Sequence, residues 1–155
     1  MVDFSAFDQK VDMTALQKEV QNADDSGFSP VPDGTYIVSV HKMEVGLTKA
    51  KDKVMFSVQM KIKDGDQKGR LLFFNRTISG SKSQKWTDAM AIKSVCTWVN
   101  KLLADGDQPV EFVNYNVLAS DVLDVFQAVQ NAIEVEVSYE EKNFNPITIN
   151  EVFEL

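Results

Sequence analysis

Residues 53–63 read KVMFSVQMKIK, and apolar and polar side chains alternate along them almost without a break. The apolar set is Val54, Phe56, Val58, Met60 and Ile62. The set between them is Lys53, Met55, Ser57, Gln59, Lys61 and Lys63. A period of two with one apolar face and one polar face predicts a half-buried strand of an antiparallel sheet. We therefore expect Ser57, Gln59 and Lys61 to face away from the core.

Similar alternation on both sides of this segment predicts a sheet of five strands. The other four expected strands are residues 35–45, 70–78, 133–139 and 146–153. A loop at 46–52 joins the first two strands, and a Gly-containing turn at 64–69 joins the second and third as a hairpin. Apolar residues at three-to-four spacing predict helices at 4–22, 84–103 and 120–131, with Ser120 able to cap the last.

The order of these elements favours one fold class. A helix, three strands, helices and two strands predict a mostly β fold with α-helices, namely a five-stranded, partly open barrel of the OB type. Its helices would lie between strands three and four, and an extra helix would precede it. A generic α+β sandwich also fits this order. We expect two parts: an N-terminal helix and linker at 1–30 and an OB-type domain at 31–155.

The charge of the chain is unevenly distributed along the sequence. The 155 residues carry a net charge of −7, yet residues 41–101 hold 13 bases and five acids, a charge of +8, and the remainder carries −15. A local positive field can recruit an anionic partner despite a negative total. The alternative is that the lysines only solvate the exposed faces of the sheet and the helix.

Several function classes find no support in the sequence. Cys96 is the single cysteine, so neither a disulfide nor a zinc framework is expected, and the setting is a cytosolic one. The first ten residues and the rest of the chain lack the apolar runs of a signal peptide or a membrane helix. His41 and Cys96 form a nucleophilic pair only if the fold brings them together, and no glycine spacing matches a phosphate loop. We expect no enzyme, no metal and no cofactor.

The remaining candidate residues match what the binding of single-stranded nucleic acid requires, namely a cationic groove for the phosphates and aromatic rings for the bases. The candidate phosphate contacts are Lys49, Lys51, Lys53, Lys61, Lys63, Arg70 and Arg76. Ser57 and Gln59 are candidate hydrogen-bonding partners. Phe73 shares the face of the strand-two lysines if its neighbours Leu72 and Phe74 point inward, since consecutive strand residues point to opposite faces. The alternative is that a helix or the amino-terminal segment covers Phe73.

A second group of candidates lies at the expected start of the long helix. Lys82, Lys85 and Trp86 stand together there, and Trp86 can either clamp a base or pack against the protein. Trp98 falls within the apolar stripe of the same helix and is expected in the core.

Three segments of the sequence resemble a known family: Val31-Pro32-Asp33-Gly34-Thr35-Tyr36, the Phe56–Ile62 strand, and the turn from Asp64 to Arg70. In order and spacing the chain resembles a bacteriophage early-gene family, a phage domain-of-unknown-function family. Some of its members are described as OB-fold single-stranded-DNA-binding proteins encoded near replication and recombination functions. The resemblance implies single-stranded DNA as ligand and the cytoplasm of a bacterial host, with the gene carried by a phage or prophage.

The sequence therefore leads to one expectation and two rivals. We expect a sequence-independent single-stranded-DNA-binding protein that supports phage DNA replication and recombination. Phage or host replication and recombination proteins are further partners to consider, a homo-oligomer stays open, and no membrane contact is expected. The first rival is a non-catalytic protein-interaction module that recruits such proteins without touching DNA. The second is a nuclease or another enzyme, which would need an acidic metal site within the basic segment.

Overall fold

The computed structural model of the chain falls into two compact units, Met1–Pro30 and Val31–Leu155. It describes residues 3, 5–9, 12–22, 30–104 and 106–155. Each unit is taken by itself below.

The described residues of the first unit form two short helices, α1 (Ser5–Asp8) and α2 (Met13–Asn22). An aspartate carboxylate caps each start: Asp3 accepts from the amide of Ser5 at 2.9 Å, and Asp12 accepts from the amide of Thr14 at 3.1 Å. The predicted helical segment 4–22 is thus divided into two helices, and Asp12 caps the longer one. Residues 4, 10 and 11 of that prediction lie outside the described residues.

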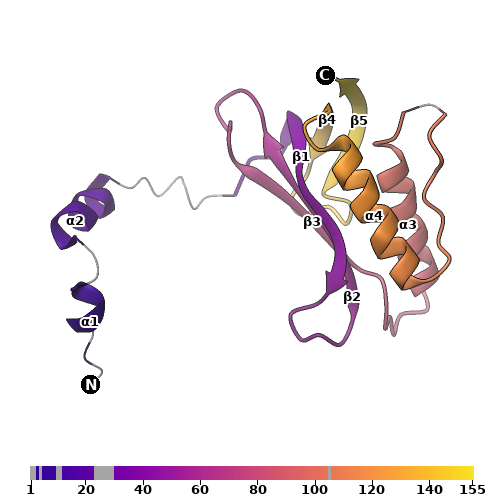
Figure 1. Cartoon of the computed structure of the whole chain (residues 1–155), viewed down its shortest axis with the longest axis horizontal. Helices are drawn as coiled ribbons and strands as arrows, with labels where there is room; N and C mark the ends of the chain where they lie inside the picture. Colours follow the sequence, from indigo (N-terminus) through magenta and orange to yellow (C-terminus); the bar gives the residue numbers. More distant parts are fainter. Residues whose placement is uncertain (1–2, 4, 10–11, 23–29, 105) are drawn as a thin grey trace. The chain divides into compact units, whose positions relative to one another are not determined.

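The second unit is built on one antiparallel sheet of five strands in the order β3-β2-β1-β4-β5. The strands are β1 (Gly34–Leu47), β2 (Val54–Ile62), β3 (Leu71–Thr77), β4 (Ile133–Tyr139) and β5 (Ile147–Glu154). The chain passes through α3 (Asp88–Asn100) and α4 (Tyr115–Val129) between β3 and β4, and both helices lie on the same side of the sheet (Figure 1). The sheet is open, with β3 and β5 as its edges and no ladder between them.

The predicted fold class is confirmed at this level. In its described residues the chain is mostly β with some α, five strands form one sheet, and α3 and α4 lie between the third and fourth strands. Closure of the sheet into a barrel, which was the finer part of the prediction, is not observed: the two edge strands do not pair.

A β-bulge in β1 changes which residues face the core. Val38 and Val40 are buried, the register against β2 then shifts between Val40 and Lys42, and Met43 becomes the next buried residue. A bulge inserts one unpaired residue, so the side chains that follow it change face. The consequence is that Lys42 joins the side of the sheet opposite the core, directly across from Gln59.

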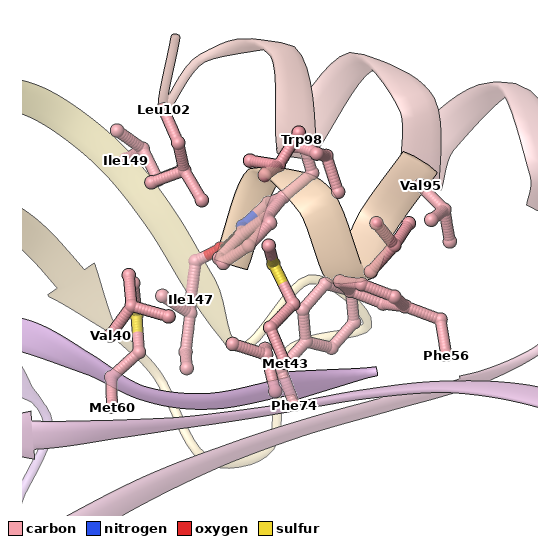
Figure 2. Packing of buried hydrophobic residues seen from close by; sticks show 14 of the residues in the cluster. Val40, Met43, Phe56, Met60, Phe74, Val95, Trp98, Leu102, Ile147 and Ile149 are labelled. Carbon is pink, nitrogen blue, oxygen red and sulfur yellow. Dashed lines mark hydrogen bonds between the residues drawn. The ribbon is translucent and has the colours of Figure 1, made fainter. Parts of the chain in front are cut away.

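The core fills the space between the sheet and the two helices (Figure 2). Phe56, Phe74 and Trp98 pack edge to face, with ring centroids 5.8–6.0 Å apart. Trp98 also donates from Nε1 to the carbonyl oxygen of Ile147 at 3.0 Å, which ties α3 to β5. Its predicted place in the core is confirmed by an exposure of 8%.

Both core helices begin at a capping side chain other than the predicted start. Thr87 caps α3, accepting from the amide of Met90 at 3.3 Å, so Trp86 precedes the helix instead of beginning it. Asn114 caps α4, accepting from the amide of Val117 at 2.8 Å, so the prediction that Ser120 caps this helix is wrong. The buried stripe of α4 already includes Leu118, which requires the helix to begin earlier than Ser120.

Candidate nucleic-acid interface

The side of the sheet turned away from α3 and α4 is called the open face here. On it, Phe73 of β3 lies directly across from Gln59 of β2, and Gln59 lies across from Lys42 of β1. The next row consists of Asn75, Ser57 and Glu44. These rows place polar side chains from three neighbouring strands around one aromatic ring.

Phe73 is 53% exposed, while its neighbours Leu72 and Phe74 are buried. This confirms the predicted placement: the alternation along β3 puts Phe73 on the same face as Ser57, Gln59 and Lys61 of β2. A phenyl ring that keeps half of its surface in water offers an apolar face to a ligand. The polar side chains beside it can donate or accept hydrogen bonds at the ligand's edge.

A hollow of about 420 Å³ lies where β2 turns into β3. Its lining includes three lysines, Lys61, Lys63 and Lys68, together with Ile62 and Gly69. Gly65 and Gly69 have φ values of 77° and 89°, which glycine adopts without strain and which shape this turn. The structure therefore gathers two predicted lysines and adds Lys68, which the sequence analysis passed over although it stands in the hairpin turn.

The loop between β1 and β2 presents the predicted Lys49, Lys51 and Lys53. The amide of Thr48 donates to the carbonyl of Lys53 at 2.9 Å, and the amide of Lys51 donates to the carbonyl of Thr48 at 2.8 Å, so the loop is a closed turn. Lys49 and Lys51 are exposed, and Lys51 has a left-handed φ of 61°. Lys53 is half-buried, with its stem packed beside Gly80, where an added Cβ would lie 3.2 Å from Lys53 Cε.

Arg70 lies at the end of the hairpin turn, one residue before β3. It is half-buried, and its Nη1 donates to Gln67 Oε1 at 2.7 Å. This bond holds the guanidinium on the turn that also carries Lys68, so the predicted Arg70 stands on the same turn as the lysine hollow.

Arg76 contradicts its prediction as an exposed phosphate contact. It lies on the core side of β3 with an exposure of 6%. Its guanidinium donates to Ser94 Oγ at 2.8 Å, to the carbonyl of Phe144 at 2.8 Å and to Asn145 Oδ1 at 2.9 Å. Burial lowers the pKa of this guanidinium. The prediction was wrong because alternate residues of a strand share a face: Arg76 lies on the core side with Phe74, whereas Phe73 lies on the open face.

Trp86 also lies away from the open face. Its ring packs edge to face against Phe144 at a centroid distance of 4.7 Å and within 5.3 Å of the Arg76 guanidinium carbon. Lys82 and Lys85 are exposed on the loop before α3. That loop is held by Asp88, whose carboxylate accepts from the amides of Gly80 at 3.1 Å and Ser81 at 2.9 Å. The predicted group around Trp86 thus forms a cluster separate from Phe73.

The model of the DUF669 family, described as a protein of unknown function, matches residues 18–154. The chain belongs to the DUF669 family. No curated protein and no solved structure matches it. The predicted resemblance to a phage domain-of-unknown-function family is therefore confirmed only as membership of DUF669.

In this DUF669 chain the match covers the entire sheet, both core helices and the open face. Within that face the charges are segregated. On the β4–β5 side, Glu136 lies directly across from Glu151, and Glu134 lies across from Phe153. On the β1 side, Lys42 Nζ lies 3.4 Å from Glu44 Oε1. The β1–β3 half of the open face thus carries Lys42, Lys61 and Phe73, with Glu44 paired to Lys42, and its acidic half, β4–β5, carries Glu134, Glu136 and Glu151.

The described residues of the DUF669 chain contain no group of three or more His, Cys, Asp or Glu side chains placed to hold a metal ion. Within the same described residues, no helix combines the length and the apolar character needed to cross a membrane. His41 is exposed on β1, whereas Cys96 is buried on α3, where burial raises the pKa of its thiol.

Proposed function

We propose that the chain binds single-stranded DNA without sequence readout, through the β1–β3 half of the open face. The observation that carries this proposal is the half-exposed Phe73 ring beside Gln59, with Lys61 on the same face. Base stacking on an aromatic ring is worth about 1–3 kcal/mol and tolerates any base, because every base has a flat π-face. The lysine hollow formed by Lys61, Lys63 and Lys68 supplies cations for the phosphates.

Single strands fit this surface better than a duplex does. In a duplex the faces of the bases are stacked on one another, so an aromatic side chain on the surface of the protein finds no free base face to contact. A single strand offers its base faces to Phe73 and its phosphates to the surrounding lysines. The exposed β1–β2 loop, with Lys49 and Lys51, extends the cationic surface beyond the sheet.

The strand connectivity supports a finer proposal about the fold. A meander of β1, β2 and β3, with β4 pairing back to β1 and β5 pairing to β4, is the connectivity of a partly open OB-type barrel. In OB-type proteins the β2–β3 face and the β1–β2 and β4–β5 loops bind oligonucleotides. The proposed DNA surface corresponds to that face and to the first of those loops.

The cellular part of the proposal comes from the family resemblance. Phage early-gene proteins of this kind imply a role in DNA replication and recombination in the cytoplasm of a bacterial host. There the chain would coat exposed single strands and meet replication or recombination proteins on them.

Titration with fluorescently labelled oligo-dT at several salt concentrations tests the proposal. Phe73→Ala should weaken binding by about 5- to 150-fold, the equivalent of one lost stacking contact. Lys61→Glu should weaken binding and reduce the slope of log affinity against log salt by about 0.7, the value for one phosphate contact. Two matched variants serve as controls: Phe153→Ala, a phenyl 38% exposed on the acidic half, and Lys93→Glu on α3.

Two results would contradict the proposal. If the wild-type chain at micromolar concentration and low salt does not change the fluorescence of labelled oligo-dT, the protein-interaction module becomes the better hypothesis. If the wild-type chain binds but Phe73→Ala and Phe153→Ala weaken binding equally, the open face does not carry the site. Duplex DNA of the same length should bind more weakly, and equal binding would rule out stacking as the mode of recognition.

A further inference from the structure

A groove lies between α3 and residues 109–112, which precede α4. Its volume is about 660 Å³, and its apolar lining includes Ala89, Ile92, Cys96 and Phe112. This volume falls within the range of roughly 300–1,000 Å³ that is typical of binding pockets. Both α3 and α4 lie on the side of the sheet opposite the open face (Figure 1), so the groove is separate from the proposed DNA surface.

The groove follows one face of α3 along most of the helix. The α3 residues that line it recur at a spacing of three or four positions, which places them on one side of the helix. They are Ala89, Ile92, Lys93, Cys96, Thr97 and Asn100. The helix rises by about 16 Å from the first to the last of them. A groove of this length accommodates about three turns of another helix, whose anchors recur at positions i, i+3 or i+4, and i+7.

The second wall of the groove is held in place by hydrogen bonds. Asn100 Oδ1 accepts from the amide of Val110 at 2.7 Å, and Asn100 Nδ2 donates to the carbonyl of Val110 at 3.1 Å. The Phe112 ring packs edge to face on Tyr115 at 5.4 Å, and the Tyr115 hydroxyl donates to the carbonyl of Ile78 at 2.7 Å. A wall that is already ordered loses little conformational freedom on binding, so more of the contact energy remains as affinity.

Apolar side chains remain in water beside this groove. Phe112 is 42% exposed although its ring is held by Tyr115, and Val113, the next residue, is 70% exposed. Exposed apolar surface of this kind marks interaction sites, and aromatic residues dominate the binding energy of protein interfaces. Phe112 is therefore the expected anchor of a binding surface.

An acidic hollow adjoins the groove. Its volume is about 380 Å³, it shares Pro109 and Val110 with the groove, and it is also lined by Asp121 and Asp124 of α4. Neither carboxylate forms an ion pair among the residues that the structure describes. Residues 102–133 contain five acids and no Lys, Arg or His. The potential around the hollow therefore favours a cationic partner.

We propose that this groove docks a partner protein through a basic amphipathic helix. The apolar side of that helix lies in the groove against Phe112, and its Lys or Arg side chains reach Asp121 and Asp124. The same carboxylates repel phosphate groups, so the surface suits a polypeptide and not a nucleic acid. The inference goes beyond the proposed DNA binding and does not depend on it, because the open face contributes none of these residues.

The test uses three fluorescently labelled peptides of about 12 residues, the length of the groove-lining face of α3. The first peptide carries Leu on one helical face and Lys elsewhere. The second has Glu in place of every Lys, and the third has the composition of the first in scrambled order. The first should bind the full chain in an anisotropy titration at 0.15 M salt. The other two should bind at least about 10-fold more weakly, because one places like charges together and the other lacks aligned anchors.

Variants of the chain locate the site of the first peptide. Phe112→Ala should weaken its binding by about 30-fold, the effect of losing one dominant aromatic contact. The matched control is Phe153→Ala, which removes a phenyl of similar exposure from β5 and should leave the affinity unchanged.

The double variant Asp121→Asn with Asp124→Asn should weaken binding by about 2- to 30-fold, the effect of two exposed ion pairs. Glu136→Gln with Glu151→Gln removes the same charge from the open face. This control should leave the affinity unchanged, because the Debye length at 0.15 M salt is only about 8 Å.

Several results would overturn the docking site. One is that no peptide binds or that all three bind equally. Another is that Phe73→Ala weakens peptide binding as much as Phe112→Ala, because the peptide then lies on the open face. If sedimentation shows a dimer that Phe112→Ala dissociates, a second copy of the chain occupies the groove in place of a partner protein. Failure of oligo-dT to bind would overturn the proposed DNA function alone, and failure of the peptide would overturn this inference alone.

Discussion

Lys51 holds a backbone conformation that suits glycine better than lysine. Its φ of 61° is left-handed, which costs an L-residue roughly 1–2 kcal/mol. Glycine avoids that cost but loses roughly 0.4–1 kcal/mol through the greater entropy of its unfolded chain. Lys51→Gly should therefore raise the free energy of unfolding by about 0.5–1 kcal/mol, measured by urea denaturation. It should also weaken oligo-dT binding and reduce the salt slope by about 0.7, because one cation is lost.

Lys49→Gly is the matched control in the same loop. Lys49 is exposed like Lys51, but its φ is not left-handed. The same loss of charge should thus come with a loss of stability of about 0.4–1 kcal/mol, opposite in sign to Lys51→Gly. If both glycine variants shift stability in the same direction, the conformational reasoning is refuted. If Lys51→Gly gains stability with unchanged binding, this loop takes no part in the interface.

Three further predictions concern the fold. Asn114→Ala should lower the free energy of unfolding by about 1 kcal/mol through loss of the α4 cap. Ser120→Ala, at an exposed position inside the helix, should raise it by about 0.5 kcal/mol. Urea denaturation measures both variants, and equal losses of stability would contradict the observed helix start. Trp98→Phe should cost about 2 kcal/mol, because the hydrogen bond to Ile147 and part of the ring volume are lost; a thermal scan showing no change would argue against this packing. The Cys96 thiol, buried and with a raised pKa, should react with an aromatic disulfide reagent at pH 8 only after denaturation, and rapid reaction of the folded chain would contradict its burial.

The sequence predicted the strands because their alternation is local information. The predicted strand 53–63 and the observed β2 (Val54–Ile62) agree within one residue at each end. In strand β1 simple alternation does not give the faces of all residues, because the buried positions change from even numbers at Val38 and Val40 to an odd number at Met43. The switch from even to odd apolar positions is visible in the sequence, and reading it as a bulge would have placed Lys42 on the open face.

The cluster around Arg76 could not be predicted from sequence. Its hydrogen bonds join β3 to Phe144 and Asn145, which are 68 and 69 residues further along the chain. Nothing in the local pattern distinguishes a strand arginine that points to water from one that meets a distant loop. The wrong start of α4 has a different cause: Asn114 and Ser120 are both good caps, and the position of the buried Leu118 decides between them.

The segregated charges on the open face bear on how the salt dependence should be interpreted. Glu136 and Glu151 face each other across β4 and β5, and like charges directly opposite destabilise a sheet. β4 lies two strand spacings from β2, about 10 Å, which is close to the Debye length of about 10 Å at 0.1 M salt. In the proposed complex, at low salt, these carboxylates would therefore repel a phosphate bound at Lys63, which lies in the row of Glu136 through Ile37. Added salt would weaken that repulsion as well as the attraction. The measured slope should then understate the number of phosphate contacts, and the repulsion should direct a bound strand away from β4 and toward the β3 edge.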